Sequence, residues 1–221
     1  MLEFDHGIGV KICGVTNVAD ARDCAAAGAD MIGLNFSPIS TRCIAPASGA
    51  QIVGAVRPHF PRLKFVGVFV NQAPELVREI AADLALDAVQ LHGDETPDDL
   101  RELDLLFVIK ALRVGLDFSE TEAVGYPSNA LLLDSWSQSL AGGTCETFPW
   151  SIAAALRPRV NRLILAGGLT SDNVAEAIRT VRPFAVDVCS GVEVRPGEKD
   201  QAKVSQFIQS VRANEGAKSV R

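Results

Sequence analysis

Two side chains that can move protons stand where apolar runs of the sequence end. Cys13 closes the run Val10–Cys13, and a thiol whose pKa is lowered can serve as a base or a nucleophile. Asp134 closes a run of three leucines, where a carboxyl group needs a partner because an unpaired buried charge is costly. Simpler interpretations remain open, with Cys13 a small filler and Asp134 a helix cap. The two residues are candidates for the base and the acid of a proton-shifting reaction.

Three further polar residues follow two other apolar runs. Arg42 comes after Met31–Phe36 and could hold a carboxylate through a bidentate pair, although in isolation it fits a solvated surface position. Gln90 and His92 lie at the end of the run that begins at Ala88. His92 could equally be a buried, hydrogen-bonded structural histidine. We take Arg42, Gln90 and His92 as candidate substrate-binding residues.

Glycine-rich loops follow the last two apolar runs. Ala166-Gly167-Gly168-Leu169 follows one of them, and Cys189-Ser190-Gly191 follows the other. Glycines let backbone N–H groups approach a ligand, and a phosphate group is a ligand that such groups bind well. Tight turns would explain one such loop, but two successive ones favour phosphate binding. The sequence has no P-loop pattern and no His and carboxylate cluster at metal spacing, so we expect no metal site.

Eight apolar runs recur along the chain and position these residues. Most are nearly continuous, as is typical of parallel strands covered on both faces. Because catalytic residues of a barrel lie where its strands end, the strand ends are where we expect the site. The runs are 10–13, 31–36, 65–70, 88–91, 106–109, 131–134, 162–165 and 185–188.

Helical patterns fill the gaps between these runs and predict an α/β fold, a single (β/α)8 TIM barrel. An open doubly wound sheet is the alternative, but no GxGxxG motif follows the first run. No linker divides the chain, so we expect one barrel domain over residues 1–212 and a solvated C-terminal tail over 213–221. The clearest helical segments are 18–28, 74–81, 172–178 and 201–211, and the weakest is 118–124.

Composition excludes several other functions. The chain has 221 residues, a formal net charge of −6 and no cluster of basic residues, so we expect no nucleic acid and no membrane as partner. Its first residues carry acids where a signal peptide carries bases, and no apolar run reaches the length of a membrane span. Five cysteines without CxxC spacing are typical of reduced thiols. We therefore expect a cytoplasmic protein.

Taken together, these motifs resemble the phosphoribosylanthranilate isomerase family of tryptophan biosynthesis. The resemblance runs from Lys11 to about Phe207, with the motifs in the family's order. Any one of them is weak evidence, but the whole series is specific. The motifs are Lys11-Ile12-Cys13-Gly14, Ser40-Thr41-Arg42, Gln90-Leu91-His92-Gly93-Asp94-Glu95, Leu132-Leu133-Asp134, Gly142-Gly143-Thr144, Leu165-Ala166-Gly167-Gly168-Leu169, Asp187-Val188-Cys189-Ser190-Gly191-Val192-Glu193 and Gly197-Glu198-Lys199-Asp200.

The resemblance implies an Amadori rearrangement of a phosphorylated sugar–anthranilate substrate without a cofactor. It makes Cys13 the general base and Asp134 the general acid. It places the anthranilate carboxylate at Arg42 and a sugar hydroxyl at Asp187. The resemblance does not decide whether the protein is a monomer or a homodimer. The remaining substrate-binding residues that it implies are Gln90, His92, Gly142, Gly143, Gly167, Gly168, Ser190 and Gly191.

Three positions depart from the family's usual motifs. Thr41 replaces a frequent proline, Cys189 a serine, and Cys145 a glycine. Because strain persists only where the surroundings enforce it, we expect an ordinary backbone with φ below zero and no catalytic role at Cys145. A barrel that binds the ligand without turnover remains the non-enzyme alternative.

Other phosphate-binding barrels share the glycine-rich loops but fit less well. A ribulose-phosphate 3-epimerase needs metal ligands, and an indoleglycerol-phosphate synthase needs its own lysine and glutamate set. A histidine-pathway isomerase carries aspartates on the first and fifth strands, where this chain has Cys13 and Lys110.

Overall fold

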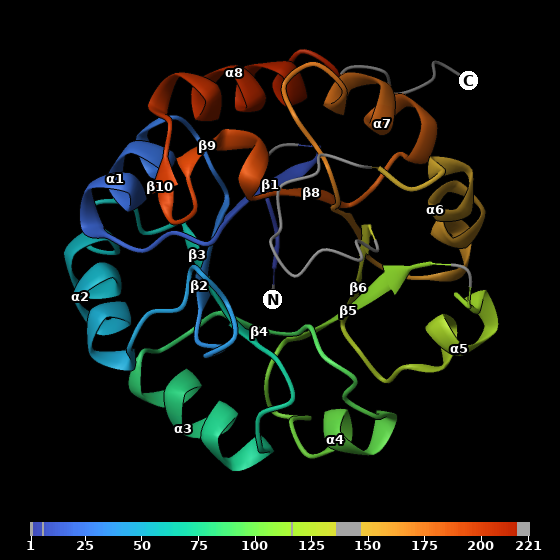
Figure 1. Ribbon diagram of the computed structural model, residues 1–221, viewed down its shortest axis with the longest axis horizontal. Coiled ribbons are helices and arrows are strands. Elements are labelled where there is room, and N and C mark those ends of the chain that lie inside the picture. Colours follow the sequence, from blue (N-terminus) through green and yellow to red (C-terminus); the bar gives the residue numbers. More distant parts are fainter. Residues whose placement is uncertain (1, 6, 116, 136–146, 216–221) are drawn as a thin grey trace.

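The computed structural model describes residues 2–5, 7–115, 117–135 and 147–215. Within them, eight parallel strands close into a barrel in the order of the sequence, each paired with its neighbours and β8 with β1 (Figure 1). The closed sheet confirms the predicted (β/α)8 barrel and excludes the open doubly wound sheet. The strands are β1 Gly9–Cys13, β2 Met31–Asn35, β3 Lys64–Phe69, β4 Ala88–Leu91, β5 Val108–Val114, β6 Ala130–Ser135, β7 Leu163–Leu165 and β8 Ala185–Val188.

Helices surround the barrel on its outer side (Figure 1). Local signals fix where several of them begin and end. Asn17 caps the first helix by accepting a hydrogen bond from the Asp20 N–H, and Gly28 follows the same helix at φ +99°, as expected of a glycine after a helix end. The helices are α1 Val18–Ala26, α2 Pro46–Val56, α3 Pro74–Asp83, α4 Pro97–Arg101, α5 Glu120–Gly125, α6 Trp150–Leu156, α7 Val174–Val181 and α8 Gln201–Arg212, with 3₁₀ turns at Arg157–Arg159 and Ser190–Val192.

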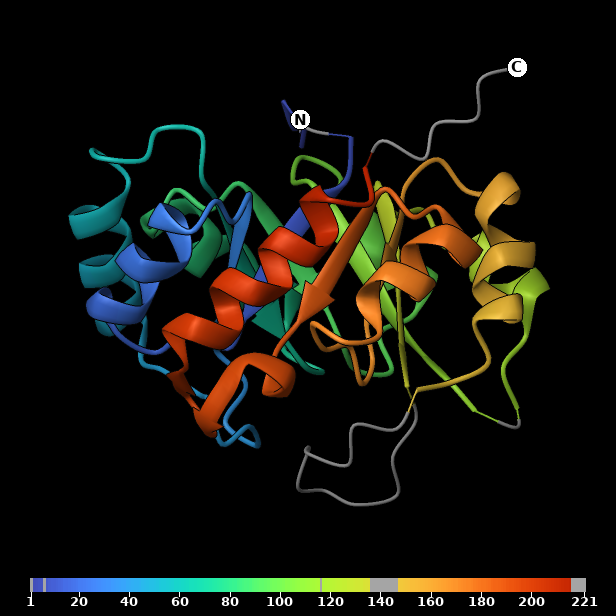
Figure 2. The same ribbon diagram turned by 90° about the horizontal axis from the view of Figure 1, so that it is seen from above.

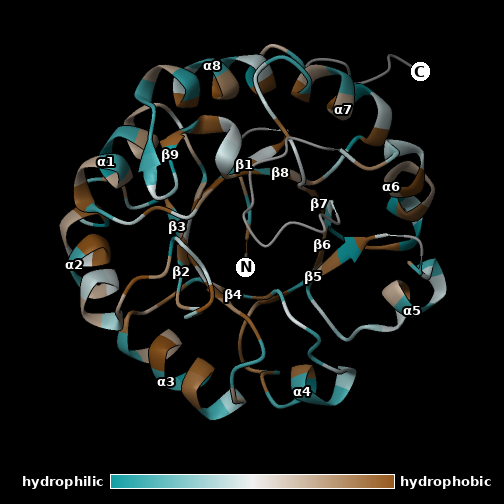
Figure 3. Ribbon diagram, viewed as in Figure 1, coloured by the Kyte–Doolittle hydropathy of each residue, from teal (hydrophilic) through white to brown (hydrophobic). Residues whose placement is uncertain are grey.

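Two apolar layers stabilise this arrangement. The larger one lies between the strands and the helices, and the smaller one fills the barrel with residues such as Met31, Ile109 and Leu132. Leu2 belongs to the inner layer and is 1% exposed. Figure 3 shows hydrophobic residues along the strands and mixed with hydrophilic ones on the helices. Burial on both faces explains why the strands have nearly continuous apolar sequences.

A short antiparallel hairpin was not predicted from the sequence. It consists of β9 Glu193–Arg195 and β10 Glu198–Lys199, joined by a turn with Gly197 at φ +83°. The hairpin lies at the opposite end of the barrel from the N-terminal residues (Figure 2). Its strands are short and charged, so they carry no apolar run. The hairpin adds charged side chains to the end of the barrel where the candidate site lies.

The chain beyond α8 remains attached to the barrel for a short distance. Arg212 Nη1 donates to Glu215 Oε1 over 2.5 Å, the Ile8 N–H donates to the same oxygen, and Arg179 Nη1 donates to Asn214 Oδ1. Asn214 and Glu215 are therefore half-buried members of the barrel surface. The expected boundary between domain and tail at residue 212 stays a prediction. No helix among the described ranges is long and apolar enough to cross a membrane.

Candidate active site

Cys13 ends β1 at the mouth of the barrel and is 9% exposed. The Cys189 thiol, which directly follows the adjacent strand β8, hydrogen-bonds to the Cys13 sulfur and is the main cause of a lowered pKa of Cys13. Burial opposes this change, whereas the positive charges of Lys11 and Lys199 reinforce it. The pKa of Cys13 therefore lies well below its ordinary value. This thiol is prepared to work as a thiolate base.

Cys189→Ala should move the acid limb of the kcat/KM–pH profile to higher pH. If the Cys13 thiolate is the general base, as the sequence predicts, kcat/KM falls as the pH drops through the pKa of Cys13. Removing the Cys189 hydrogen bond raises that pKa, whereas Cys189→Ser retains a donor and should keep the limb near its wild-type position. Steady-state kinetics over a pH series measures the effect. An alanine variant with an unshifted limb would contradict this role of Cys189.

A buried ion pair is formed by Lys11, which lies two residues before Cys13 in β1. Lys11 is fully buried, and its Nζ is 3.0 Å from Asp187 Oδ1. Burial alone would lower the pKa of Lys11, but Asp187 and Cys13 outweigh it and raise that pKa. Burial raises the pKa of Asp187 to about 7 in spite of Lys11. The structure thus brings Asp187 to the site and gives it Lys11 as its partner.

Arg42, in the loop between β2 and α2, has a partner that sequence analysis did not predict. Its Nε donates to Glu193 Oε1 over 2.8 Å, and its Nη2 donates to Glu193 Oε2 over 2.6 Å. Lys199 Nζ also lies 2.8 Å from Glu193 Oε1. Burial alone would raise the pKa of Glu193, but Arg42 and Lys199 lower it to about 2. The hairpin β9–β10 therefore holds the Arg42 guanidinium at the mouth by a bidentate pair.

Asp134, in β6, has its partner in the residue that directly follows β4. His92 Nε2 is 3.2 Å from Asp134 Oδ2, and the Ser135 N–H donates to Asp134 Oδ1 over 2.8 Å. Gln90 lies beneath His92, with its Nε2 3.0 Å from His92 Nδ1. The structure thus brings three predicted site residues together in one series of close polar contacts, Gln90–His92–Asp134. The carboxyl group that closes the leucine run has the partner that its position requires.

A second buried ion pair holds the turn after His92. Lys110 Nζ, from β5, is 2.5 Å from Glu95 Oε2 and donates to the Gly93 carbonyl over 2.8 Å. Glu95 also accepts hydrogen bonds from the backbone N–H groups of Gly93 and Asn71. Because each of these groups is satisfied, the turn is fixed. The fixed turn places the imidazole of His92 toward Asp134.

The two glycine-rich loops meet each other at the mouth. A Cβ atom at Gly191 would lie 2.1 Å from the Leu169 carbonyl oxygen, and one at Gly167, where φ is +85°, would lie 2.4 Å from the Ser135 nitrogen. Both positions therefore require glycine for close packing of backbones. The loop that contains Gly167 and Gly168 thus meets the segment of Ser190 and Gly191 through Leu169, and phosphate binding by these two loops stays a prediction.

Three residues of the sequence analysis lie outside the described residues. These are Gly142 and Gly143, which we expect to contact substrate, and Cys145, which we expect to have φ below zero. All three expectations stay predictions.

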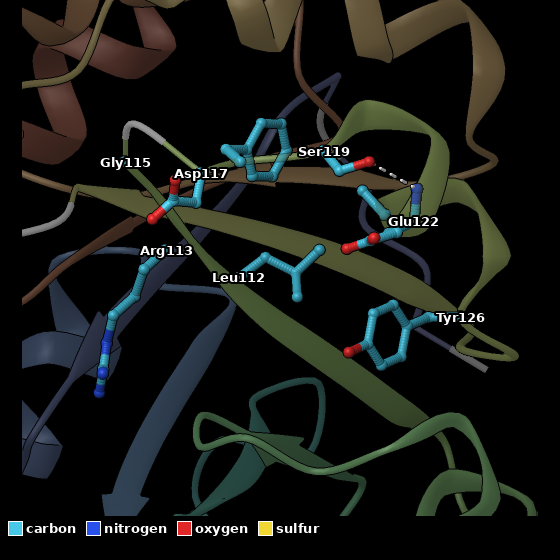
Figure 4. A pocket seen from close by; sticks show the side chains of 9 residues that line it. Leu112, Arg113, Gly115, Asp117, Ser119, Glu122 and Tyr126 are labelled. Atoms are coloured by element: carbon cyan, nitrogen blue, oxygen red, sulfur yellow. Dashed lines mark hydrogen bonds between the residues drawn. The ribbon is translucent and has the colours of Figure 1, made fainter.

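Two other kinds of binding site were considered from the geometry. A cavity of about 350 Å³ lies between β5 and α5, lined by residues such as Leu112, Ser119 and Tyr126 (Figure 4). Leu112 packs against the layer between sheet and helices, and neither Cys13 nor Asp134 lines this cavity. In the part of the chain that the structure describes, no three His, Cys, Asp or Glu side chains are grouped to hold a metal ion.

Four residues of the site were not predicted as functional. Lys11, Glu193 and Lys199 lay within motifs of the resemblance but received no role, and Cys189 was noted as a departure. A signal for Lys11 exists in the sequence, because a lysine between Val10 and Ile12 in an apolar strand must be buried and paired. No comparable signal exists for Glu193 and Lys199, because the hairpin that carries them is not visible in the sequence.

Comparisons with known proteins agree on one family. The family model described as N-(5'phosphoribosyl)anthranilate (PRA) isomerase matches residues 10–210. A relative of that name from Trichlorobacter lovleyi is 47% identical over 205 residues, 93% of this chain and 98% of its own. The relative of that name from Thermotoga maritima is 42% identical over 204 residues, 92% of this chain and 98% of its own.

Solved structures give the same result. A crystal structure of phosphoribosyl anthranilate isomerase from Thermotoga maritima has a TM-score of 0.86 and 40% sequence identity, covering 93% of this chain and 99% of that chain. A second structure holds reduced 1-(o-carboxyphenylamino)-1-deoxyribulose 5-phosphate and has a TM-score of 0.83, 39% identity and the same coverage. With Cys13, Asp134 and two glycine-rich loops gathered at the mouth of a (β/α)8 barrel, the chain belongs to the N-(5'-phosphoribosyl)anthranilate isomerase family.

Proposed function

We propose that this chain catalyses the Amadori rearrangement of N-(5-phosphoribosyl)anthranilate to 1-(2-carboxyphenylamino)-1-deoxyribulose 5-phosphate, in tryptophan biosynthesis. The observation that carries the proposal is the placement of Cys13 and Asp134 at the same end of the barrel, on β1 and β6. Each has fixed polar partners, Cys189 for the base and His92 for the acid. The membership of the family supports the same reaction.

Asp134 opens the sugar ring in the first step. Its carboxyl proton goes to the furanose ring oxygen, the bond between that oxygen and C1 breaks, and the nitrogen lone pair forms a C=N bond. Asp134 is left as a carboxylate. The His92 nitrogen at 3.2 Å can donate a hydrogen bond to that carboxylate, and such preorganised donors stabilise a charge that develops in the transition state.

Cys13 removes a proton in the second step. The thiolate takes the proton from C2 of the open-chain intermediate, the electron pair of the C2–H bond forms a C1=C2 bond, and the C=N electrons return to nitrogen. The enol that results tautomerises to the ketone of the product. The lowered pKa of Cys13 favours the thiolate, which is the form that a general base requires.

Arg42 and the glycine-rich loops bind the two charged ends of the substrate in this proposal. Nε and Nη2 of Arg42 serve Glu193, which leaves donors on Nη1 for the anthranilate carboxylate. Backbone N–H groups of Gly167, Gly168, Ser190 and Gly191 hold the phosphate, since glycine-rich turns expose such groups. Asp187 and His92 contact the substrate between these two ends in the proposal, and Gly142 and Gly143, which lie outside the described residues, are further substrate-binding residues that it includes.

Loss of the anthranilate-type fluorescence of the substrate on adding purified protein tests the function. The fluorescence should disappear at a rate proportional to protein concentration, and a Cys13→Ala preparation should not produce the change. Substrate that binds without any loss of fluorescence would establish the alternative of a binding protein without turnover.

Arg42→Ala should raise KM by about tenfold or more while kcat changes by less than about threefold. The guanidinium holds a carboxylate remote from the reacting carbons, so its contribution is the same in the substrate and the transition state. A hydrogen bond to a charged group is worth about 1.5–3 kcal/mol, which corresponds to roughly 10- to 100-fold in affinity. Steady-state kinetics separates the two constants, with Cys43→Ala as the control at an adjacent, exposed residue. A kcat collapse at unchanged KM would place Arg42 in the chemistry.

A further inference from the structure

Gln90 is a buried amide in β4 with a single polar role among the described residues. It is 1% exposed, and its Nε2 lies 3.0 Å from His92 Nδ1. Its Oε1 is buried and has no hydrogen-bond partner within that part of the chain. Burying an amide is costly unless it is hydrogen-bonded, and an aliphatic side chain would fill the same space at no such cost. The contact with His92 therefore accounts for glutamine at this position.

The geometry around His92 determines which of its nitrogens carries the proton. A neutral imidazole has one N–H donor and one acceptor nitrogen. The amide NH₂ of Gln90 is a donor and lies 3.0 Å from Nδ1, so Nδ1 is the acceptor and Nε2 carries the proton. His92 Nε2 faces Asp134 Oδ2 at 3.2 Å, where the carboxylate charge develops when Asp134 gives up its proton. The opposite tautomer would place two donors against each other at Nδ1.

We propose that Gln90 is a positioning residue that keeps the proton of His92 on Nε2 and thereby directs an N–H group at Asp134. This inference rests on the function proposed above, in which Asp134 loses its proton to the substrate. The N–H group is in place before the carboxylate charge develops, so no reorganisation is needed during the proton transfer. Gln90 acts through His92 and does not itself touch the substrate.

The tautomer of His92 in the resting protein tests the proposal directly. The chain has three histidines, so ¹⁵N NMR of the ring nitrogens with a His92→Asn sample for assignment is decisive. The wild type should carry the proton on Nε2. Gln90→Glu offers an acceptor in place of a donor and should draw a proton to Nδ1. Gln90→Met keeps the side-chain length but removes both hydrogen-bonding groups, so the two tautomers should mix.

Gln72→Met provides the matched control. Gln72 also has a buried Oε1 without a partner among the described residues, and its Nε2 donates to the Phe36 carbonyl. This variant loses an amide of the same kind at the same end of the barrel but should leave the His92 resonances unchanged. A Gln90→Met protein should have kcat lowered by about tenfold or more with KM within about twofold, because the wrong tautomer affects the chemical step.

Two results would overturn the proposal. One is a wild-type protein with the His92 proton on Nδ1, which needs no variant to observe. The other is a set of His92 resonances that remains unchanged in Gln90→Met. Both readouts come from the resting protein, so they do not depend on turnover. An inactive wild-type protein would instead refute the proposed function. An active wild-type protein, together with a Gln90→Met variant in which the His92 tautomer is unchanged, would refute the role of Gln90 alone.

Discussion

Cys13→Ala is expected to lower kcat by about 10²–10⁴-fold, the range of a general base, while the protein remains folded. The thiolate is the group that takes the C2 proton, and alanine offers no acceptor. The partners that lower the pKa of Cys13 cannot replace it, because Lys11 and Lys199 are cations and the pKa of Cys189 is raised well above its ordinary value. Turnover measured by the loss of substrate fluorescence, together with circular dichroism for the fold, checks the expectation.

Two other cysteines provide matched controls for this substitution. Cys24 is fully buried in α1, and burial raises its pKa to about 12, so it stays a neutral thiol. Cys43 is exposed. Cys24→Ala loses packing contacts in the core, whereas Cys43→Ala loses few contacts. Both variants should retain most of the turnover. A Cys13→Ala protein with more than a tenth of the wild-type turnover would show that another group is the base.

The fold could be predicted to a large extent because strands that are buried on both faces have nearly continuous apolar sequences. All eight apolar runs correspond to strands, and the errors lie at their ends. The run 106–109 predicts a strand that begins at Leu106, whereas β5 begins at Val108 and extends to Val114. The helix predicted over 118–124 occupies Glu120–Gly125, with Ser119 as its cap. These shifts arise because apolar residues next to a strand pack in the same core and look alike in sequence.

The site could be predicted only as single residues, because its partners are far apart in the chain. Arg42 and Glu193 are separated by 151 positions, and Lys11 and Asp187 by 176. A residue type and its strand-end position indicate that a side chain reaches the mouth of the barrel. They do not indicate which other charge it meets there. Arg42 therefore has the expected location, whereas its pairing with Glu193 emerges only from the closed barrel and the hairpin.

Asp134→Asn is expected to lower kcat by about 10²–10⁴-fold, the range of a general acid, with little change in KM. Asparagine has nearly the same volume and retains an oxygen for the Ser135 N–H, so the local backbone should persist. It has no proton to give to the ring oxygen, and its NH₂ group would face the N–H of His92. The ring-opening step therefore loses both its acid and the hydrogen bond that stabilises the conjugate base.

Binding measurements separate this loss of chemistry from a loss of affinity. The open-chain analogue reduced 1-(o-carboxyphenylamino)-1-deoxyribulose 5-phosphate, which a solved structure of a phosphoribosyl anthranilate isomerase holds, has no ring to open. Its affinity for Asp134→Asn should therefore stay within about threefold of the wild type, or roughly 0.7 kcal/mol. Asp94→Asn, the same substitution at an exposed residue after β4, should retain most of the turnover. Asp134→Asn could instead bind the analogue normally and still turn over substrate at more than a tenth of the wild-type rate. The proton for ring opening would then have to come from another donor, and His92 is the neighbouring group that could supply it.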